Sequence, residues 1–487
     1  MSVAPLSIHG AFAASRFRQH AHALLLIPYG RELPGGMPAR GQWLATLKRR
    51  SFKPDELAKT PLALDLPNGS RMVCAMIDDS KSRFERLTLL RKATMLLLDE
   101  LPKELAIGVF NDNSDVARDA AYVALANGAP LPQRKKKPGQ PLRHVHVFGA
   151  GKDTDFTPVT ALAQGNLLSR ELTALPPNEL TPASYRTRIR DLAKKSGWKI
   201  EEYDYPRLMK MGAGAFCAVA QGSDHEDAAI VHLRYQPAAA NHNIALVGKG
   251  ICFDTGGHNL KPARYMAGMH EDMNGSAVVL GLLQTISALK LPVTVDAWLA
   301  IAHNHISPKA YTQNAVVKAL NGMTIEIIHT DAEGRMVLAD TLTLAARGVN
   351  ANKPQLIIDF ATLTGSMHVA LGSRYSGVFA TTDALGHMAV DAGRTSGERV
   401  SLFPFDDDYE AALDSKIADI KQCTLEGEAD HILAARFLQK FTLKCPWMHV
   451  DLSSSNCTGG LGAVATDLTG FGVAWGMHFI QQWLRRD

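Results

Sequence analysis

Short apolar runs alternate with amphipathic stretches along most of the chain, and these units become longer after about residue 156. Before that point, runs such as "MVCAMI" and "HVHVF" alternate with helical patterns such as "RLTLLRKATMLLLDEL". Short apolar runs are typical of buried strands, whereas apolar residues spaced three and four apart are typical of helices. The pattern therefore predicts a small N-terminal α/β domain over residues 1–155.

Residues 156–180 predict a helix and a break, which we interpret as a linker. The stretch "FTPVTALAQGNLLSRELTA" has a helical pattern, and the prolines of "LPPNELTP" interrupt it. Thr181 is then expected to cap a new helix with Pro182 at its first position and Gly197 just beyond its end.

Residues 181–487 predict a second, larger α/β domain. Buried-type strands ("IVHLRY", "NIALVG", "VTVDAWLAIAH", "QLIIDFA", "MHVDL") alternate with helices such as "GSAVVLGLLQTISALK". This alternation indicates a mixed, largely parallel central sheet flanked by helices. Ligands of such sheets bind beyond the carboxyl ends of the strands, so the polar residues found there are the first candidates for a site.

Composition narrows the class of protein. The chain has 487 residues, of which 46% are hydrophobic and 21% charged, and its formal net charge is only +4. Such a balance gives no indication of a nucleic-acid or membrane partner. The segment "QRKKKP", with Arg134, Lys135, Lys136 and Lys137, is a candidate nucleic-acid patch, but its flanking prolines favour a solvated loop.

Cysteine usage and hydropathy indicate a cytosolic protein. The six cysteines lie far apart and form no C-x-x-C pair, which argues against a structural zinc site and against a disulfide framework. Apolar runs stay well below the roughly 18 residues that a membrane span needs. We therefore expect a reducing, cytoplasmic setting and no membrane partner.

Charged residues gather where the predicted strands end. Carboxylates are rarely buried unless they are paired or bound to a metal, so a strand-like apolar run such as "IIHTDAEGRMVLAD" needs a partner for its acidic residues. Three segments carry this charge, and their candidate residues are Lys249 and Asp254, then Lys261 and Asp272, then Asp331, Glu333 and Arg335.

Four carboxylates converging in a half-buried place would repel one another and require cations. Two divalent ions, magnesium, manganese or zinc, about 3.5 to 4 Å apart would suit such donors and the hydrolysis of an amide or a phosphoester. Lys261 and Arg335 would then be electrostatic helpers, and Lys249 would have to be neutral to bind a metal. A buried salt-bridge network between sheet and helices is the alternative.

At these residues the sequence resembles the leucyl aminopeptidase (cytosol aminopeptidase) family. The family hallmark N-T-D-A-E-G-R followed by L-V-L-A-D reads "HTDAEGRMVLAD" here, and "VGKGICFDTGGHNLKP" matches a second block closely. "DFATLTGS" and "NELTPASY" extend the likeness over roughly residues 150–487. The first 150 residues match only weakly.

The resemblance implies a role for each candidate. Asp254 and Glu333 would bridge two metals, Asp331 would complete one site, and Lys249 and Asp272 would complete the other. Lys261 would polarise the scissile carbonyl, and Arg335 would hold a bicarbonate that acts as the general base. Met269 would line the pocket for the first side chain, and Thr362, Leu363 and Gly365 would contact the substrate backbone.

The resemblance also implies an activity and an assembly. We expect a metal-dependent aminopeptidase that removes N-terminal residues, large apolar ones above all, from peptides. Manganese or zinc is the expected metal, with magnesium or cobalt as alternatives, and the expected assembly is a homohexamer. A DNA-binding role with reduced or altered peptidase activity is the alternative function, and a two-metal phosphoesterase fits less well because a lysine ligand suits peptides better than phosphates.

Three residues next to the expected ligands depart from the family pattern. His329 stands where the family has Asn, His270 where it usually has Lys or Arg, and Asn274 where it has Gly. In addition, "AHNH" replaces A-E-N-x, "TQNAV" replaces R-P-G-D-V, and "ADHIL" replaces a G-G-x-I-T block. These changes remove no expected ligand, but they bear on metal preference, specificity and pH optimum.

Overall fold

The computed structural model describes every residue except 1, 112, 152, 351 and 487. The chain divides into two compact units. The N-terminal unit comprises Met1–Leu167, Arg394–Glu398 and Cys457–Thr469, and the C-terminal unit comprises Leu168–Gly393, Arg399–Asn456 and Gly470–Asp487. Within the described residues, no helix combines the length and apolar character needed to cross a membrane, and the six cysteines are free.

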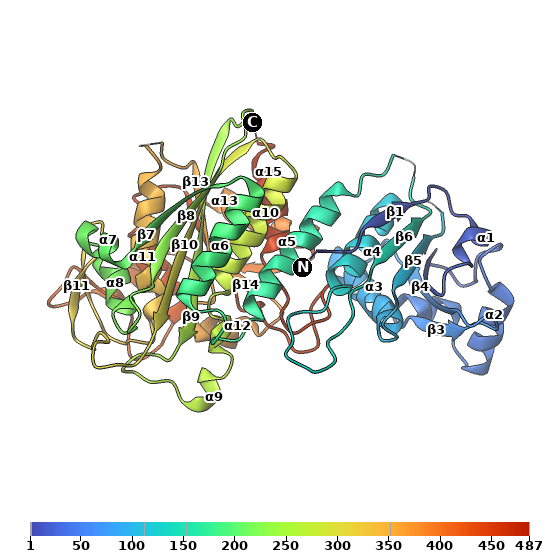
Figure 1. Cartoon of the computed structure of the whole chain (residues 1–487), viewed down its shortest axis with the longest axis horizontal. Helices are drawn as coiled ribbons and strands as arrows, with labels where there is room; N and C mark the ends of the chain where they lie inside the picture. The colour runs from blue at the N-terminus through green and yellow to red at the C-terminus, as the bar shows by residue number, and fades with distance from the viewer. Residues whose placement is uncertain (1, 112, 152, 351, 487) are drawn as a thin grey trace. The chain divides into compact units, whose positions relative to one another are not determined.

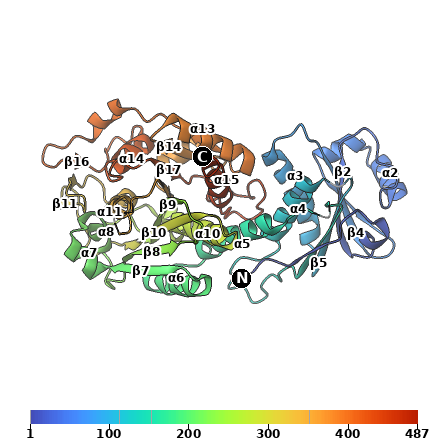
Figure 2. The same cartoon turned by 90° about the horizontal axis from the view of Figure 1, so that it is seen from above.

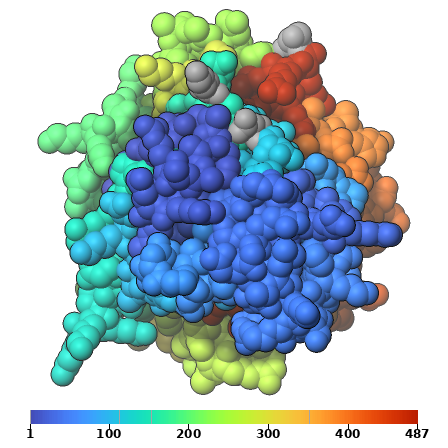
Figure 3. All heavy atoms as spheres, turned by 90° about the vertical axis from the view of Figure 1, so that its right-hand side faces the viewer, coloured from blue at the N-terminus to red at the C-terminus, as the bar shows by residue number. Residues whose placement is uncertain are grey.

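The N-terminal unit is built on a six-stranded sheet, and the residues of its first part are drawn in blue in Figure 3. The strand order is β1-β6-β5-β2-β4-β3, parallel except for the pair β3 and β4. The basic side chains at 134–137 are exposed on an irregular segment, as expected of a solvated loop. Its strands and helices are β1 (Leu6–Ile8), α1 (Ala14–Phe17), β2 (His22–Pro28), α2 (Arg40–Arg49), η1 (Pro54–Ala58), β3 (Leu62–Asp65), β4 (Arg71–Ile77), α3 (Arg83–Leu98), β5 (Glu104–Val109), α4 (Ser114–Asn127) and β6 (His144–Phe148), and α5 (Thr157–Thr173) leads into the C-terminal unit.

The C-terminal unit contains an eight-stranded mixed sheet of order β15-β14-β17-β13-β9-β10-β8-β7. At its centre β17, β13, β9 and β10 are parallel, whereas β14, β8 and β7 pair antiparallel with neighbours. The predicted α/β class, with a mixed central sheet between helices, is confirmed. The strands are β7 (Lys199–Asp204), β8 (Ala229–Tyr235), β9 (His242–Asp254), β10 (Val293–Asn304), β13 (Leu356–Ala361), β14 (Ser376–Ala380), β15 (Val400–Leu402) and β17 (Trp447–Asp451).

Helices cover both faces of this sheet, as Figures 1 and 2 show. A small sheet of β11 (Val316–Lys318), β12 (Thr324–Glu326) and β16 (Ile420–Lys421) completes the unit. The helices are α6 (Pro182–Ser196), α7 (Tyr205–Met211), α8 (Gly214–Ala220), α9 (Ala263–Met266), η2 (Met269–Glu271), α10 (Asn274–Ala288), α11 (Glu333–Arg347), α12 (Gly365–Leu371), α13 (Asp383–Ser396), η3 (Asp407–Leu413), α14 (Asp430–Gln439) and α15 (Val473–Trp483).

Side-chain alternation on β9 decides which helix covers which face. Gly248 faces α10, because a Cβ atom there would lie only 2.6 Å from the Cα of Ser276. Lys249, the next residue, points to the opposite face and reaches Gly334 at the start of α11. Glycine at 248 thus lets α10 approach the sheet closely, while α11 covers the face on which Lys249 lies.

One sequence-based expectation is wrong in its details. The apolar run at 327–330 is not a strand, because β12 already ends at Glu326. The amide oxygen of Gln422 accepts hydrogen bonds from the backbone of Ile328 at 2.7 Å and of His329 at 3.1 Å. Side-chain oxygens therefore replace a β-ladder partner in this buried, irregular segment.

Candidate metal centre

The candidate carboxylates and lysines come from neighbouring segments of the C-terminal unit. Lys249 and Asp254 lie on β9, and Asp254 is its last residue. Asp272 directly follows η2, two residues before α10 begins, and Glu333 is the first residue of α11. Both helices begin beside β9, since Gly275 approaches the backbone of Lys249 and Gly334 approaches its side chain.

Three of the carboxylates converge on one point. An oxygen of each of Asp254, Asp272 and Glu333 lies within 4.8 Å of the other two, and all three side chains are buried. The Nζ of Lys249 lies 2.8 Å from Asp272 Oδ1 and 2.9 Å from Glu333 Oε1. The ammonium group of Lys249, only 3% exposed, therefore sits between two buried carboxylates.

A second lysine joins the fourth carboxylate to this cluster. The Nζ of Lys261 lies 3.0 Å from Asp254 Oδ2 and 2.5 Å from Asp331 Oδ1. With all groups ionised, two lysines against four carboxylates leave a formal charge of 2 − 4 = −2 on the cluster. The cluster is thus short of positive charge.

Two buried oxygens of the cluster also lack donors. Asp272 Oδ2 and Glu333 Oε2 have no hydrogen-bond partner among the described residues. A salt-bridge network alone would leave these oxygens desolvated and unpaired, which costs free energy. Excess negative charge and orphaned carboxylate oxygens fit divalent cations that take oxygen donors, such as magnesium, manganese or zinc.

The pKa values of the cluster residues also reflect the competition between burial and charge pairing. Burial raises the pKa of Asp272 to about 7 although Lys249 opposes this, and burial raises the pKa of Asp331 to about 7 against the influence of Lys261. For Glu333 burial also disfavours the charge, but Lys249 and Lys261 outweigh it and lower its pKa. Burial disfavours the ammonium of Lys249, yet Asp272 and Glu333 raise its pKa, so it is a cation in this structure.

Other residues hold the carboxylates in place. Asp254 Oδ1 accepts hydrogen bonds of 2.8 Å from Asn304 Nδ2 and from the backbone of Gly256. Thr362 donates its hydroxyl to Asp272 Oδ1 at 2.7 Å, and its carbonyl accepts from Lys249 Nζ at 3.0 Å. Sequence reasoning missed Asn304, although its place at the end of a buried strand next to β9 is the signal that could have found it.

Arg335 lies on α11, but its partners are residues outside the carboxylate cluster. Its Nη2 donates to Asp430 Oδ1 at 2.8 Å and its Nη1 donates to the carbonyl of Gln422 at 2.9 Å. The guanidinium group is 3% exposed. The anion that faces Arg335 in this chain is therefore the carboxylate of Asp430, within the "ADHIL" segment that departs from the family pattern.

A cavity of about 350 Å³ opens beside the cluster. Two of the residues that line it, Lys261 and Asp331, belong to the cluster itself. His329 also lines it, and its Nδ1 accepts a 3.2 Å hydrogen bond from the backbone of Asp331, which steadies the turn into α11. The remaining lining residues are Asn259, Leu260, Pro262 and Tyr265.

The expected substrate residues do not line this cavity, although Thr362 contacts Asp272 and Lys249. Met269 and Leu363 are half-buried, and Leu363 lies close to Gly334, whereas Gly365 is exposed at the start of α12. Of the departures, His270 is half-buried. Asn274 is buried and donates its side-chain amide to Thr173 Oγ1 at 3.0 Å, so it serves packing between α10 and α5.

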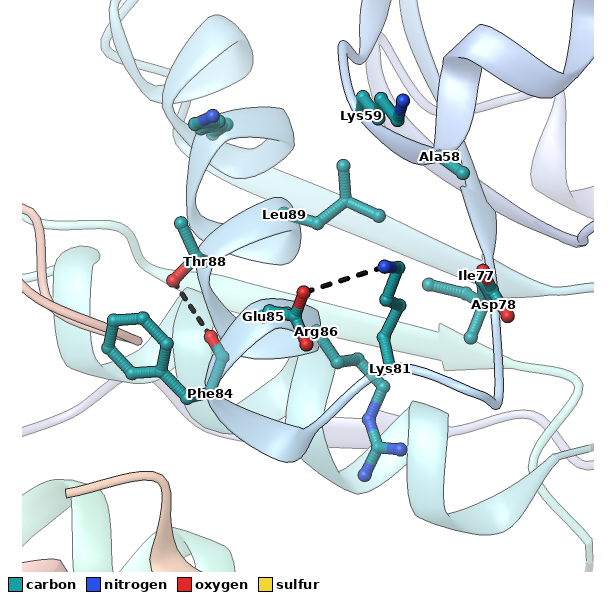
Figure 4. A pocket seen from close by; sticks show the side chains of 11 residues that line it. Ala58, Lys59, Ile77, Asp78, Lys81, Phe84, Glu85, Arg86, Thr88 and Leu89 are labelled. Atoms are coloured by element: carbon teal, nitrogen blue, oxygen red, sulfur yellow. Dashed lines mark hydrogen bonds and ion pairs between the residues drawn. The ribbon is translucent and has the colours of Figure 1, made fainter. Parts of the chain in front are cut away.

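A second cavity, of about 290 Å³, lies within the N-terminal unit. Figure 4 shows its apolar wall with Leu89 and Ile77, and Lys81 directed toward Glu85, from which its Nζ lies 3.6 Å away. Arg86 is held by Asp119 through two hydrogen bonds of 2.8 and 2.6 Å. Among its described lining residues, Asp78 and Glu85 are the only carboxylates, so this cavity has no cluster comparable to the one in the C-terminal unit.

The buried cluster of carboxylates and lysines beside the central sheet is a candidate metal centre of an α/β protein. Residues 167–475 match the model of the cytosol aminopeptidase family, catalytic domain. A probable cytosol aminopeptidase of Afipia carboxidovorans is 40% identical over 66% of this chain and 62% of its own length. One from an Acidovorax species is 38% identical over 74% of this chain and 72% of its own length.

The structural comparison extends beyond the matched domain. A solved structure described as the bottromycin maturation enzyme BotP in complex with Mn has a TM-score of 0.83 and 28% sequence identity. It covers 95% of this chain and 100% of that one. The chain therefore belongs to the cytosol aminopeptidase family, as the resemblance of its motifs predicted, although it spans only about 62% of the length of the Afipia relative.

Proposed function

We propose that the protein is a metal-dependent aminopeptidase that removes N-terminal residues from peptides. The observation that carries the proposal is the convergence of Asp254, Asp272 and Glu333 within 4.8 Å, beside a cavity that Lys261 lines. Membership of the cytosol aminopeptidase family supports it. A substrate carbonyl in that cavity would lie next to both a cation and the carboxylate cluster.

The metals would be held by the residues that form the cluster. We propose two divalent ions, held by Asp254, Asp272, Asp331 and Glu333, with Lys249 as a further ligand once it has lost its proton. Manganese or zinc is the proposed metal, with magnesium or cobalt as alternatives, and manganese is the metal named with the structural neighbour. When bound, such ions supply an activated water and a Lewis acid.

The protein's own groups supply positioning and charge. Lys261, whose pKa its neighbouring carboxylates raise despite burial, stays protonated and can donate a hydrogen bond to the oxyanion of the tetrahedral intermediate. Asn304, Gly256 and Thr362 keep the carboxylates oriented, so they are positioning residues. A free α-amine on the substrate would be attracted to the negative cluster, which would restrict cleavage to N-terminal residues.

Proton transfer is assigned to the neighbourhood of Arg335. Bicarbonate, the expected general base, would have to share this guanidinium group with Asp430. We propose that the carboxylate of Asp430 takes the place of that anion. A preference for large apolar N-terminal residues is proposed by analogy with the family, because the half-buried Met269 and Leu363 do not line the cavity. A cytoplasmic homohexamer is proposed by analogy with the family alone.

The test is hydrolysis of a panel of aminoacyl-anilides by the purified full chain. After metal removal, manganese, zinc, magnesium or cobalt is added back, and each anilide is compared with its N-acetylated form. We expect activity to return with metal, to be highest for leucyl and methionyl substrates, and to vanish on acetylation. Equal cleavage of acetylated substrates, or no cleavage with any metal, would overturn the proposal.

A further inference from the structure

Four histidines and a glutamate gather in the N-terminal unit, whereas the carboxylate cluster is formed by segments of the C-terminal unit. β6 pairs in parallel with β1 and β5, with Ser7 opposite His146 and Glu104 opposite His144. Residues paired across a parallel ladder share one face of the sheet, and alternate residues of a strand do the same. His144, His146 and Glu104 therefore share a face of the sheet, opposite to the one on which the buried Val145 and Val147 lie.

The side chains on this face meet at one point. A ring nitrogen of His20, a carboxylate oxygen of Glu104 and a ring nitrogen of His146 all lie within 4.8 Å of one another. Within this group, His146 Nε2 and Glu104 Oε2 are 3.5 Å apart. The rings of His20 and His146 have centroids 4.4 Å apart, so the loop before β2 brings His20 directly over the sheet.

His146 has the hydrogen-bond pattern expected of a metal ligand. Its Nδ1 lies 3.1 Å from His9 Nε2, whereas its Nε2 is buried and makes no hydrogen bond among the described residues. When Nδ1 carries the proton and donates to His9, the lone pair of Nε2 faces Glu104 and His20. Ligating histidines characteristically use the second nitrogen in this way. His9 itself is fixed by stacking on Phe148 at a centroid distance of 4.3 Å.

We propose that His20, Glu104 and His146 form a binding site for a divalent transition metal, with zinc as the best fit. Two imidazoles and a carboxylate are a donor set typical of zinc, whereas magnesium and calcium prefer oxygen donors alone. Nothing in this site contributes to the proposed peptidase chemistry, so it is a separate function of the N-terminal unit.

The spacing of the donors suits such an ion after a small movement. Tetrahedral ligands at zinc–nitrogen distances of about 2.0 to 2.1 Å are roughly 3.4 Å apart. The pair of His146 and Glu104 already has this spacing at 3.5 Å, and the other pairs lie within 4.8 Å, so at most a small shift of His20 is needed. His20 is half-buried in a bend between α1 and β2, where a small shift disturbs no strand.

The charge of the surroundings is compatible with a cation. Burial lowers the pKa of His20 although Glu104 opposes this, and burial together with neighbouring histidines lowers the pKa of His146, which favours the neutral ring that a metal requires. Arg16 places a positive charge near His9, and the carboxylate of Glu104 opposes it at the centre of the cluster. Glu104 is 59% exposed at its side chain, so the site opens to solvent and an ion can enter.

The experiment counts zinc on the full chain. Wild type and the variants His20→Gln, Glu104→Gln and His146→Gln are dialysed against low-micromolar zinc chloride, and zinc per chain is measured by mass spectrometry. Each variant should hold one zinc fewer than wild type and keep its peptidase activity, which shows that the other metals remain bound. His22→Gln is the matched control, because its ring pairs with Glu100 at 2.9 Å and should leave the count unchanged.

Equal zinc counts in wild type and all three variants would overturn the site. If His146→Gln does not fold, the two more exposed positions, 20 and 104, still decide the question. Wild type supplies an independent measurement, the labelling of His20 by diethylpyrocarbonate with and without zinc. Protection of His20 by zinc supports the site, and the same labelling in both conditions contradicts it.

Discussion

Replacing Lys249 with methionine removes a positive charge that touches two buried carboxylates while keeping most of the side-chain volume. The lost contacts are 2.8 Å to Asp272 and 2.9 Å to Glu333. At an effective dielectric constant of about 20, each such contact is worth roughly 6 kcal/mol before the cost of burying the ammonium is subtracted. Removing one partner of a buried ion pair costs about 3 to 5 kcal/mol in net terms.

Thermal unfolding in EDTA at pH 8 measures this cost. For a unit of this size, each kcal/mol of lost stability lowers the melting temperature by about 2 °C, so Lys249→Met should melt roughly 6 to 10 °C below wild type. Added manganese should restore much of the loss, because a divalent ion replaces the missing charge. Lys309→Met is the control, since this exposed lysine lies 3.9 Å from Asp224 and its loss should change little. Equal melting temperatures of Lys249→Met and wild type in EDTA would refute the charge deficit.

Two further predictions concern protons and the partner of Arg335. The folded-state pKa values of Asp272 and Asp331 are raised from 3.8 to about 7, so the folded metal-free protein holds more protons than the unfolded chain between about pH 4 and 7. Its stability in urea should therefore fall as the pH rises through that window. Manganese binding should release protons, which calorimetry can measure. A stability in EDTA that rises or stays flat with pH would contradict this. Asp430→Ala should lower kcat in bicarbonate-free buffer by about 10²-fold or more, the typical contribution of a general base. Added bicarbonate should then restore part of the rate. A loss of kcat that bicarbonate does not rescue would assign Asp430 a structural role only.

Local rules predicted the regular elements well. Thr181, Pro182 and Gly197 delimit α6 as expected, because each satisfies a requirement of a helix end: Thr181 accepts from the backbone of Ser184, and Gly197 adopts φ 71°. The continuous apolar run of β9 likewise required burial on both faces. Charged residues were expected to meet at the ends of parallel strands, and the candidates do meet, but only Asp254 ends a strand: Lys249 lies within β9, and Glu333 begins α11.

Tertiary contacts escaped prediction. No local pattern shows that Gln422 satisfies the backbone at 328 and 329, so an apolar run that is irregular in the structure looked like a strand. The pairing of Arg335 with Asp430 joins residues 95 positions apart, and only the fold brings them together. The histidine cluster was also missed, although the period of two in "HVHVF" places His144 and His146 on one face.

The most direct test of the carboxylate cluster is a titration of the metal-stripped chain with manganese while leucyl-anilide hydrolysis and bound metal are measured together. We expect wild-type activity to rise to a plateau at two equivalents per chain. Glu333→Gln, which removes a carboxylate that touches Lys249 at 2.9 Å and shares the cluster with Asp254, should bind less manganese and lose activity. Full activity without metal, or undiminished hydrolysis by Glu333→Gln, would contradict it.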